Sequence, residues 1–141
     1  TIEVESPLGS VLAAPQGITE ALENLLANAV HYGLGGGGSR IWVRTEITPV
    51  RSLRLIVEDD GPGVPAEYRE RVFDLFQRLS TDRQGTGVGL AVVARVMEVH
   101  GGGAVAEGAG GPEGREGARF VLTFPPEAVL LPGNPADSEP Q

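Results

Sequence analysis

Glycines recur at alternate positions near both ends of residues 59–90, and we call these two runs glycine ladders. They are the residues of this chain most typical of a ligand-binding site. In the first ladder, Gly61 and Gly63 follow Asp59 at alternate positions. The second ladder opens into an apolar segment and consists of Gly85, Gly87 and Gly89. Glycine lets backbone approach a ligand closely, and the first amides of a helix favour an anion such as phosphate. Together the ladders predict a nucleotide site, although each alone would fit an ordinary turn.

The alternation of residues 53–58 predicts different orientations for the three consecutive acidic residues Glu58, Asp59 and Asp60. Apolar side chains occupy every second position, and continuing this parity turns Asp59 toward the core. A carboxylate that faces the core needs a hydrogen-bond donor, so we expect one for Asp59. Glu58 is expected to remain in solvent, and Asp60 to shape the turn.

A polar stripe follows one face of a helix predicted from about Gln16 to Tyr32, because apolar residues recur at helical spacing on the opposite face. The stripe contains Glu20, Asn24, Asn28 and His31, with Tyr32 on its flank. Such an amide-rich stripe suits ligand binding, and incidental surface asparagines are the alternative. The glycine-rich residues 33–38 are expected to end the helix with a left-handed cap and a flexible turn.

The remaining segments complete an outline of the fold. Residues 68–79 predict a short amphipathic helix, and the polar residues 80–86 a mobile lid. Arg78 and Arg83 bracket that lid and could reach phosphates, although surface arginines are common. Residues 87–99 are apolar nearly all round and predict a largely buried helix, stopped by the glycines at 101–103.

Strands are expected at both ends of the chain and after each helix. The expected strands are residues 1–6, 10–14, 40–47, 53–58, 104–106 and 119–124, with an inward row of Phe120, Leu122 and Phe124. After Pro125 the composition turns polar and proline-rich. We therefore expect a domain over residues 1–125 and a mobile tail over residues 126–141.

Composition excludes several classes of protein. The net charge of -8 argues against a nucleic-acid surface, and the chain contains no cysteine. All basic residues are arginine, which rules out a Walker A loop and a protein-kinase strand lysine. His31 and His100 lie too far apart in sequence to suggest a zinc site. Neither a signal peptide nor an apolar run long enough to cross a membrane is visible.

The order of these motifs resembles the catalytic and ATP-binding domain of sensor histidine kinases in the GHKL ATPase superfamily. Residues 23–32 resemble the N box, 59–63 the first glycine box, 71–76 the F box and 85–90 the second glycine box. The likeness extends over nearly all of residues 1–125 and is greatest to sensors with a short lid. It implies a Bergerat-type fold, an α/β two-layer sandwich in which helices cover one mixed sheet.

The resemblance also implies ATP and Mg²⁺ as cofactors. Asn28 would hold Mg²⁺, Asn24 would support the phosphates and Asp59 would accept a hydrogen bond from the adenine amino group. The positions implied to contact the nucleotide are Asn24, Asn28, His31, Tyr32, Asp59, Gly61, Gly63, Arg78, Arg83, Gly85, Thr86, Gly87, Val88, Gly89 and Leu90. His31 stands where the family usually has lysine or arginine, which leaves phosphate charge less neutralised near neutral pH.

The implied activity is phosphoryl transfer to a histidine outside this chain. Asn24 stands where the superfamily's ATPases carry a water-activating glutamate, and an amide is not a general base, so no catalytic residue is assigned here. Neither histidine has the sequence context of a phosphoacceptor. We therefore expect a monomeric cytoplasmic domain, without direct membrane contact, that serves a histidine-bearing dimerisation domain of the same sensor and, downstream, a response regulator.

Three alternatives stay open. A serine-kinase anti-sigma factor would share the fold but would phosphorylate a protein serine. A catalytically degenerate, nucleotide-binding regulatory module would fit the unusual His31. A plain glycine-rich structural domain would leave the coincidence of four boxes unexplained.

Overall fold

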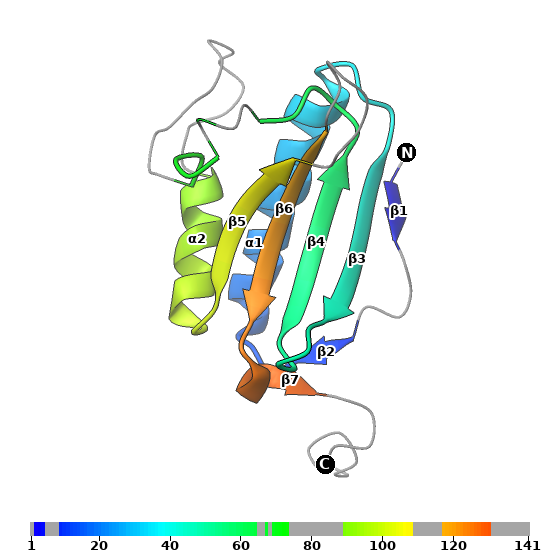
Figure 1. Ribbon diagram of the computed structural model, residues 1–141. Coiled ribbons are helices and arrows are strands. Elements are labelled where there is room, and N and C mark those ends of the chain that lie inside the picture. Colours follow the sequence, from blue (N-terminus) through cyan, green and yellow to red (C-terminus); the bar gives the residue numbers. More distant parts are fainter. Residues whose placement is uncertain are drawn as a thin grey trace.

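The computed structural model describes residues 2–4, 9–64, 67, 69–73, 89–108 and 117–130. Two helices, α1 (Pro15–Asn28) and α2 (Gly89–Val99), cover one face of a five-stranded sheet (Figure 1). In spatial order the strands are β1 (Ile2–Val4), β3 (Ile41–Ile47), β4 (Leu53–Asp59), β6 (Ala118–Phe124) and β5 (Gly103–Gly108). Only the β1–β3 pair among them is parallel. The expected two-layer α/β sandwich with one mixed sheet is confirmed.

Alternation along the strands builds the core between the sheet and the helices. The predicted inward row of β6, Phe120, Leu122 and Phe124, is at most 2% exposed. It packs with Leu25 of α1 and Met97 of α2, both fully buried. Burying side chains of this size, at about 1.5–3 kcal/mol each, supplies the main force that holds the helices on the sheet.

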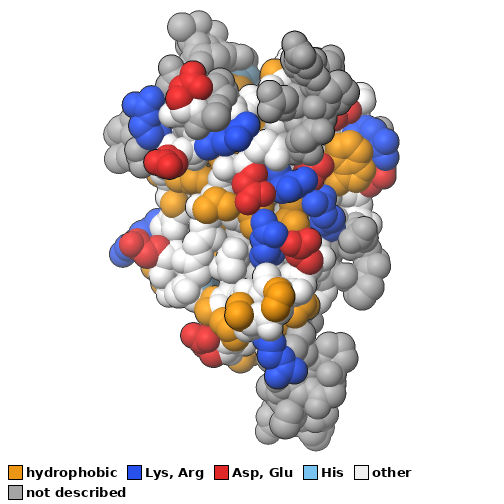
Figure 2. Space-filling view, in the orientation of Figure 1, with side chains coloured by type: hydrophobic (Ala, Val, Ile, Leu, Met, Phe, Trp, Pro, Cys, Tyr) orange, Lys and Arg blue, Asp and Glu red, His pale blue; other side chains and the backbone are white. Residues whose placement is uncertain are grey.

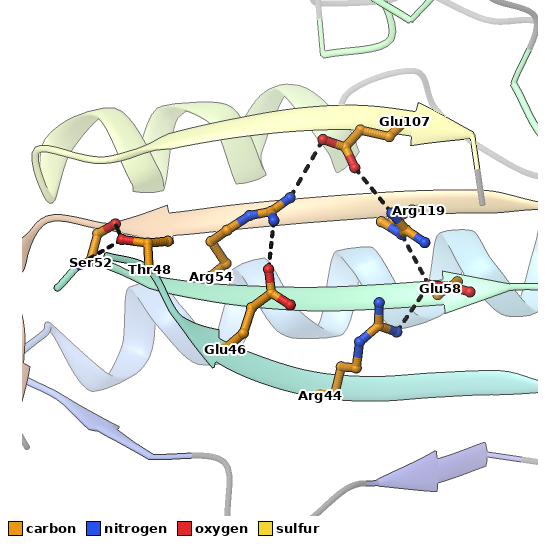
Figure 3. Close-up of polar contacts among 8 residues, drawn as sticks. All are labelled: Arg44, Glu46, Thr48, Ser52, Arg54, Glu58, Glu107 and Arg119. Carbon is orange, nitrogen blue, oxygen red and sulfur yellow. Dashed lines mark hydrogen bonds and ion pairs between the residues drawn. The ribbon is translucent and has the colours of Figure 1, made fainter. Parts of the chain in front are cut away.

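The outer face of the sheet carries a chain of ion pairs that crosses four strands. Figure 2 shows acidic and basic side chains alternating across this face, and Figure 3 shows how six of them connect. In order, the six are Arg44, Glu58, Arg119, Glu107, Arg54 and Glu46. We call this set the outer-face ion-pair chain.

Glu58 corrects one prediction, because it does not stand free in solvent. Its Oε1 accepts hydrogen bonds from Arg44 Nη1 at 2.9 Å and Arg119 Nε at 3.0 Å, and only 16% of its side chain is exposed. Between these charges lies Ile56, which pairs in register with Arg44 and Val121 and is 1% exposed. The long arginine stems allow an apolar residue to be buried on a face that alternation alone marks as polar.

Helix α1 ends differently from the expectation. Instead of stopping at Gly33, it continues as η1 (Ala29–Leu34), a π-helix in which the Gly35 N–H donates to Val30 O at 3.0 Å. The predicted left-handed glycine is Gly37, with φ of 111°. Gly33 is therefore a buried helical residue and not a cap.

Helix α2 buries one side only, so the prediction of a largely buried helix was wrong. Val93 and Met97 face the core, whereas Val99 is 67% exposed. A two-layer sandwich offers a helix no second apolar surface. As predicted, glycine stops the helix: Gly101 takes φ of 78°, and the Gly102 N–H donates to Met97 O at 2.8 Å.

A histidine joins the end of α2 to the start of α1. His100 Nε2 accepts a hydrogen bond from the backbone N–H of Ala14 at 3.0 Å. On the other side of the ring, Nδ1 lies 2.8 Å from the carbonyl oxygen of Val96. Ala14 is the residue just before α1, and no side chain of its own caps that helix.

Two further expectations needed correction. Of the expected helix 68–79, residue 68 and residues 74–79 lie outside the described part. The described residues 69–73 form a turn, in which Val72 is buried and Phe73 packs edge-on to Phe120 with ring centroids 6.1 Å apart. Residues 126–130 belong to the packed fold and not to a tail. They form η3 (Pro126–Ala128) and β7 (Val129–Leu130), which pairs antiparallel with β2 (Ser10–Val11). Residues 131–141 lie outside the described part.

Within the described residues, none of the helices is long and apolar enough to cross a bilayer.

Candidate nucleotide site

Four segments meet at one end of the sandwich, the upper end in Figure 1. They are the end of α1 with η1, the end of β4, the first turn of α2 and the start of β6. These segments, or the residues directly after them, hold nine of the predicted site residues: Asn24, Asn28, His31, Tyr32, Asp59, Gly61, Gly63, Gly89 and Leu90. The fold therefore brings the N box, the first glycine box and the end of the second glycine box to one place.

Asp59 is the buried acceptor of this region. It is 3% exposed at the end of β4, and its Oδ1 accepts a hydrogen bond from the Gly61 N–H at 2.9 Å. Burial raises the pKa of the Asp59 carboxyl, and hydrogen bonds from the backbone amides of Gly61 and Ala118 oppose that rise. The inward orientation and the donor that parity predicted for Asp59 are both confirmed.

Asp60 points away from Asp59 and ties two loops together. Its Oδ1 accepts from the backbone amides of Ser39 at 2.7 Å and Arg40 at 3.0 Å, and its Oδ2 lies 3.1 Å from Ser39 Oγ. These hydrogen bonds, led by the one from Arg40, lower the pKa of Asp60. Asp60 thus fixes the exit of the glycine-rich segment onto the end of β4, a role wider than the local turn that we predicted for it.

The first glycine box packs without room for side chains. Gly63 has φ of 84°, and a Cβ atom added there would lie 2.7 Å from the Gly117 carbonyl oxygen. In return, the Gly117 N–H donates to Gly61 O at 3.0 Å. This packing anchors the turn after β4 to the start of β6, so Gly61 and Gly63 have a structural reason to be glycine whatever they bind.

The amides of α1 lie beside the start of α2. Asn24 is half-buried and donates from Nδ2 to Glu20 O at 2.9 Å. A Cβ atom added to Gly89 would lie 3.0 Å from Asn24 Oδ1, so the second glycine box meets the N box at this pair. Asn28, one turn further along α1, is also half-buried.

The donor set suits Mg²⁺ held by few protein ligands. Among the described residues, no group of three or more His, Cys, Asp or Glu side chains could hold a metal. Mg²⁺ usually keeps several waters and takes one or two protein oxygens together with substrate phosphates. A single amide oxygen from Asn28 fits that pattern.

His31 and Tyr32 are consecutive residues of η1, and their rings are in contact. Their ring centroids are 4.4 Å apart in an edge-to-face arrangement at 82°. Both are half-buried, and Leu90 is a half-buried neighbour of the core at the start of α2. The other predicted site residues, Arg78, Arg83, Gly85, Thr86, Gly87 and Val88, lie outside the described residues.

Gly33 and Ser39 support the site, and neither was predicted to do so from the sequence. A Cβ atom added to Gly33 would lie 2.5 Å from Asp59 Cγ, so the π-helix passes directly over the buried carboxylate. The glycine-rich run was a visible signal, but by itself it predicts only a left-handed cap and a flexible turn. Nothing in the sequence marked Ser39 as a partner of Asp60.

The sequence of this chain is similar to a known protein family and to individual known proteins. Residues 13–128 match the family described as "Histidine kinase-, DNA gyrase B-, and HSP90-like ATPase". The sensor-type histidine kinase PrrB of Mycobacterium tuberculosis is 37% identical over 123 residues, which are 86% of this chain and 26% of PrrB. This chain thus spans about a quarter of the length of that relative.

Solved structures show the same fold. The mycobacterial sensor histidine kinase MprB superposes with a TM-score of 0.77 at 30% identity, covering 88% of this chain and 83% of that one. Full-length ShkA in complex with AMPPNP superposes with a TM-score of 0.69 at 30% identity, covering 92% of this chain and 26% of that one.

Proposed function

This chain belongs to the histidine kinase-, DNA gyrase B- and HSP90-like ATPase family, as a domain of the kind found in sensor histidine kinases, and from this premise we propose its function. It binds Mg²⁺-ATP and passes the γ-phosphoryl group to a histidine on a separate domain of the same sensor. The observation that carries the proposal is the buried Asp59 carboxylate, held at the end of the sheet beside the amide-bearing end of α1.

Asp59 would recognise the adenine base. Its carboxylate already accepts the Gly61 N–H, and a carboxylate has further lone pairs for an amino group. Because Asp59 is nearly excluded from water, a hydrogen bond there competes little with solvent. Tyr32 would pack against the base from η1, and the backbone at Gly61 and Gly63 would border it.

The phosphates would lie between α1 and the start of α2. Asn28 would give an oxygen to Mg²⁺, which when bound would neutralise phosphate charge. Asn24 would donate toward the phosphates, and the N-terminal end of a helix such as α2 favours an anion. Gly89, Leu90 and the second-glycine-box residues 85–88 would border the phosphates, with Arg78 and Arg83 closing over them and His31 nearby.

The phosphoryl acceptor would be supplied by another domain. The chain contains two histidines, and the structure engages both in packing. His100 uses both ring nitrogens in contacts with Ala14 and Val96, and His31 packs on Tyr32. Asn24 also cannot act as a general base toward water. These features favour transfer to an external histidine over hydrolysis or self-phosphorylation.

The proposed partners follow from the relatives. MprB and PrrB are sensor histidine kinases, so we propose a histidine-bearing dimerisation domain as the direct partner and a response regulator downstream. The domain would act as a monomer on the cytoplasmic side. ShkA was solved with AMPPNP, a triphosphate analogue of ATP, which supports the choice of nucleotide.

A labelled-phosphate assay tests the proposal. The chain is incubated with Mg²⁺ and γ-labelled ATP, alone and together with the histidine-bearing helical domain of its sensor. We expect acid-labile label on the helical domain only, and none when its acceptor histidine is replaced by glutamine. Label on this chain by itself, or vigorous phosphate release without the partner, would overturn the proposal. Acid-stable label on a partner's serine would favour the anti-sigma kinase alternative.

A further inference from the structure

Gly33 lies in closer contact with Asp59 than any side-chain-bearing residue could. A Cβ atom added to Gly33 would lie 2.5 Å from Asp59 Cγ and 2.8 Å from both Asp59 Cβ and Oδ2. Real Cβ atoms do not approach other atoms so closely, so one of the two residues would have to move. The bare Cα of Gly33 is therefore what leaves room for the carboxylate in its present orientation.

Asp59 has little freedom to move away. Its backbone lies in register with Ile41 of β3 on one side and with Ala118 of β6 on the other. Its Oδ1 is held by the Gly61 N–H, which leaves Oδ2 on the side of Gly33. A side chain at position 33 would therefore turn the carboxylate and would not displace the strand.

Two other glycines, Gly38 and Gly61, hold the backbone of Gly33 in place. Its carbonyl oxygen accepts the Gly38 N–H at 2.9 Å. A Cβ atom added to Gly61 would lie 2.5 Å from the Gly33 oxygen and 2.7 Å from its Cα, so the two backbones are in contact. The π-helical turn cannot withdraw from the carboxylate without breaking this packing.

We infer that Gly33 is a positioning residue for base recognition, which holds the Asp59 carboxylate in the one orientation that accepts the amino group of a 6-aminopurine. This inference rests on the proposed function, because it assigns the base to Asp59. It adds to that function a residue without a side chain, outside the positions that the family resemblance assigns to the nucleotide.

The test compares ATP with purine riboside triphosphate, which lacks the 6-amino group. Dissociation constants with Mg²⁺ are measured by calorimetry for the wild type, Gly33→Ala and Gly17→Ala. We expect the wild type to prefer ATP by about 10- to 100-fold, the value of one charge-assisted hydrogen bond. In Gly33→Ala this preference should fall toward one, while the affinity for purine riboside triphosphate changes little.

Gly17→Ala is the matched control. Gly17 lies in α1, the helix that η1 continues, and a Cβ atom added there would meet Val96 and His100 side-chain atoms at 3.6 and 3.8 Å, which are ordinary contacts. It should melt at a higher temperature, because alanine favours a helix, and it should keep the wild-type preference. If Gly33→Ala does not fold alone, it is made together with Gly17→Ala.

The outcomes separate the inference from the function on which it rests. A wild type that does not distinguish the two nucleotides would refute the assignment of the base to Asp59. If the wild type prefers ATP and Gly33→Ala keeps that preference, the role of Gly33 is refuted and the assignment of the base to Asp59 stands. Equal weakening of both nucleotides, or failure to fold in both backgrounds, would show that Gly33 serves the fold and not the carboxylate.

Discussion

Removing the charge of Glu58 should expose the energetic contribution of the outer-face ion-pair chain. Glu58→Gln keeps the size of the side chain and an acceptor oxygen, but it leaves Arg44 and Arg119 without the carboxylate that both now contact through one oxygen. Exposed ion pairs contribute up to about 1 kcal/mol each, and these pairs are more than two-thirds buried. Two such pairs give a loss of about 1–2 kcal/mol in the free energy of unfolding. For a chain of this size that corresponds to a melting temperature lower by about 3–8 °C.

The assay is urea unfolding at low and high salt, with an exposed pair as the control. Arg95 and Glu98 lie 2.6 Å apart on α2, but their side chains are 73% and 70% exposed, so Glu98→Gln should cost less than about 0.5 kcal/mol. Raising the salt from about 0.1 M to about 1 M shortens the screening length from about 10 Å to about 3 Å, which should shrink the cost of Glu58→Gln. A double-mutant cycle with Arg44→Gln isolates the pair. If Glu58→Gln costs no more than Glu98→Gln, or if the cycle with Arg44→Gln gives no coupling, the ion-pair reasoning is wrong.

Three further substitutions test the site. Asn28→Ala should keep the fold and lose Mg²⁺-dependent ATP binding; calorimetry that finds unchanged affinity would remove Asn28 from the metal site. Asp59→Asn should weaken ATP binding by about 1.5–3 kcal/mol. Burial raises the pKa of Asp59 above its ordinary 3.8, so ionisation of this carboxyl weakens the fold. Asp59→Asn should therefore unfold at a higher temperature than wild type near about pH 7. Thermal scans should show this gain shrinking as the pH falls through the raised pKa and absent below about pH 4. Asp60→Ala should cost about 1–2 kcal/mol near about pH 7, because Ser39 and Arg40 lose a charged acceptor. Since the pKa of Asp60 is lowered, urea unfolding should show that cost diminishing as acid protonates the wild-type carboxyl; a cost independent of pH would contradict the role given to its charge.

Local alternation predicted the strands and the orientation of Asp59, because one buried face imposes a period of two on the sequence. The same alternation failed for Ile56 and Glu58, whose burial depends on arginines from neighbouring strands. Nothing in the local sequence of a strand indicates which arginine side chains of the neighbouring strands will contact it. Strand β7 was missed for a related reason, since its partner β2 comes from the opposite end of the chain.

The π-helix at the end of α1 was also beyond local reasoning. Its residues have ordinary helical spacing, and the wider turn coincides with the close packing of Gly33 on Asp59. Sequence motifs named many of the candidate ligand positions, and the fold gathers the described ones at one end. The motifs did not reveal that the backbone of Gly33 and Gly61, and not side chains, holds the buried Asp59 carboxylate in place.

The two backbone contacts of His100 determine which of its ring nitrogens carries the hydrogen. The Ala14 amide can only donate and the Val96 carbonyl can only accept, so Nε2 must be bare and Nδ1 must carry the hydrogen. The imidazole is thereby confined to a single neutral tautomer. In a nitrogen-detected NMR spectrum this ring should give one protonated Nδ1 and one unprotonated Nε2 signal, a direct marker that the start of the first helix and the end of the second remain joined.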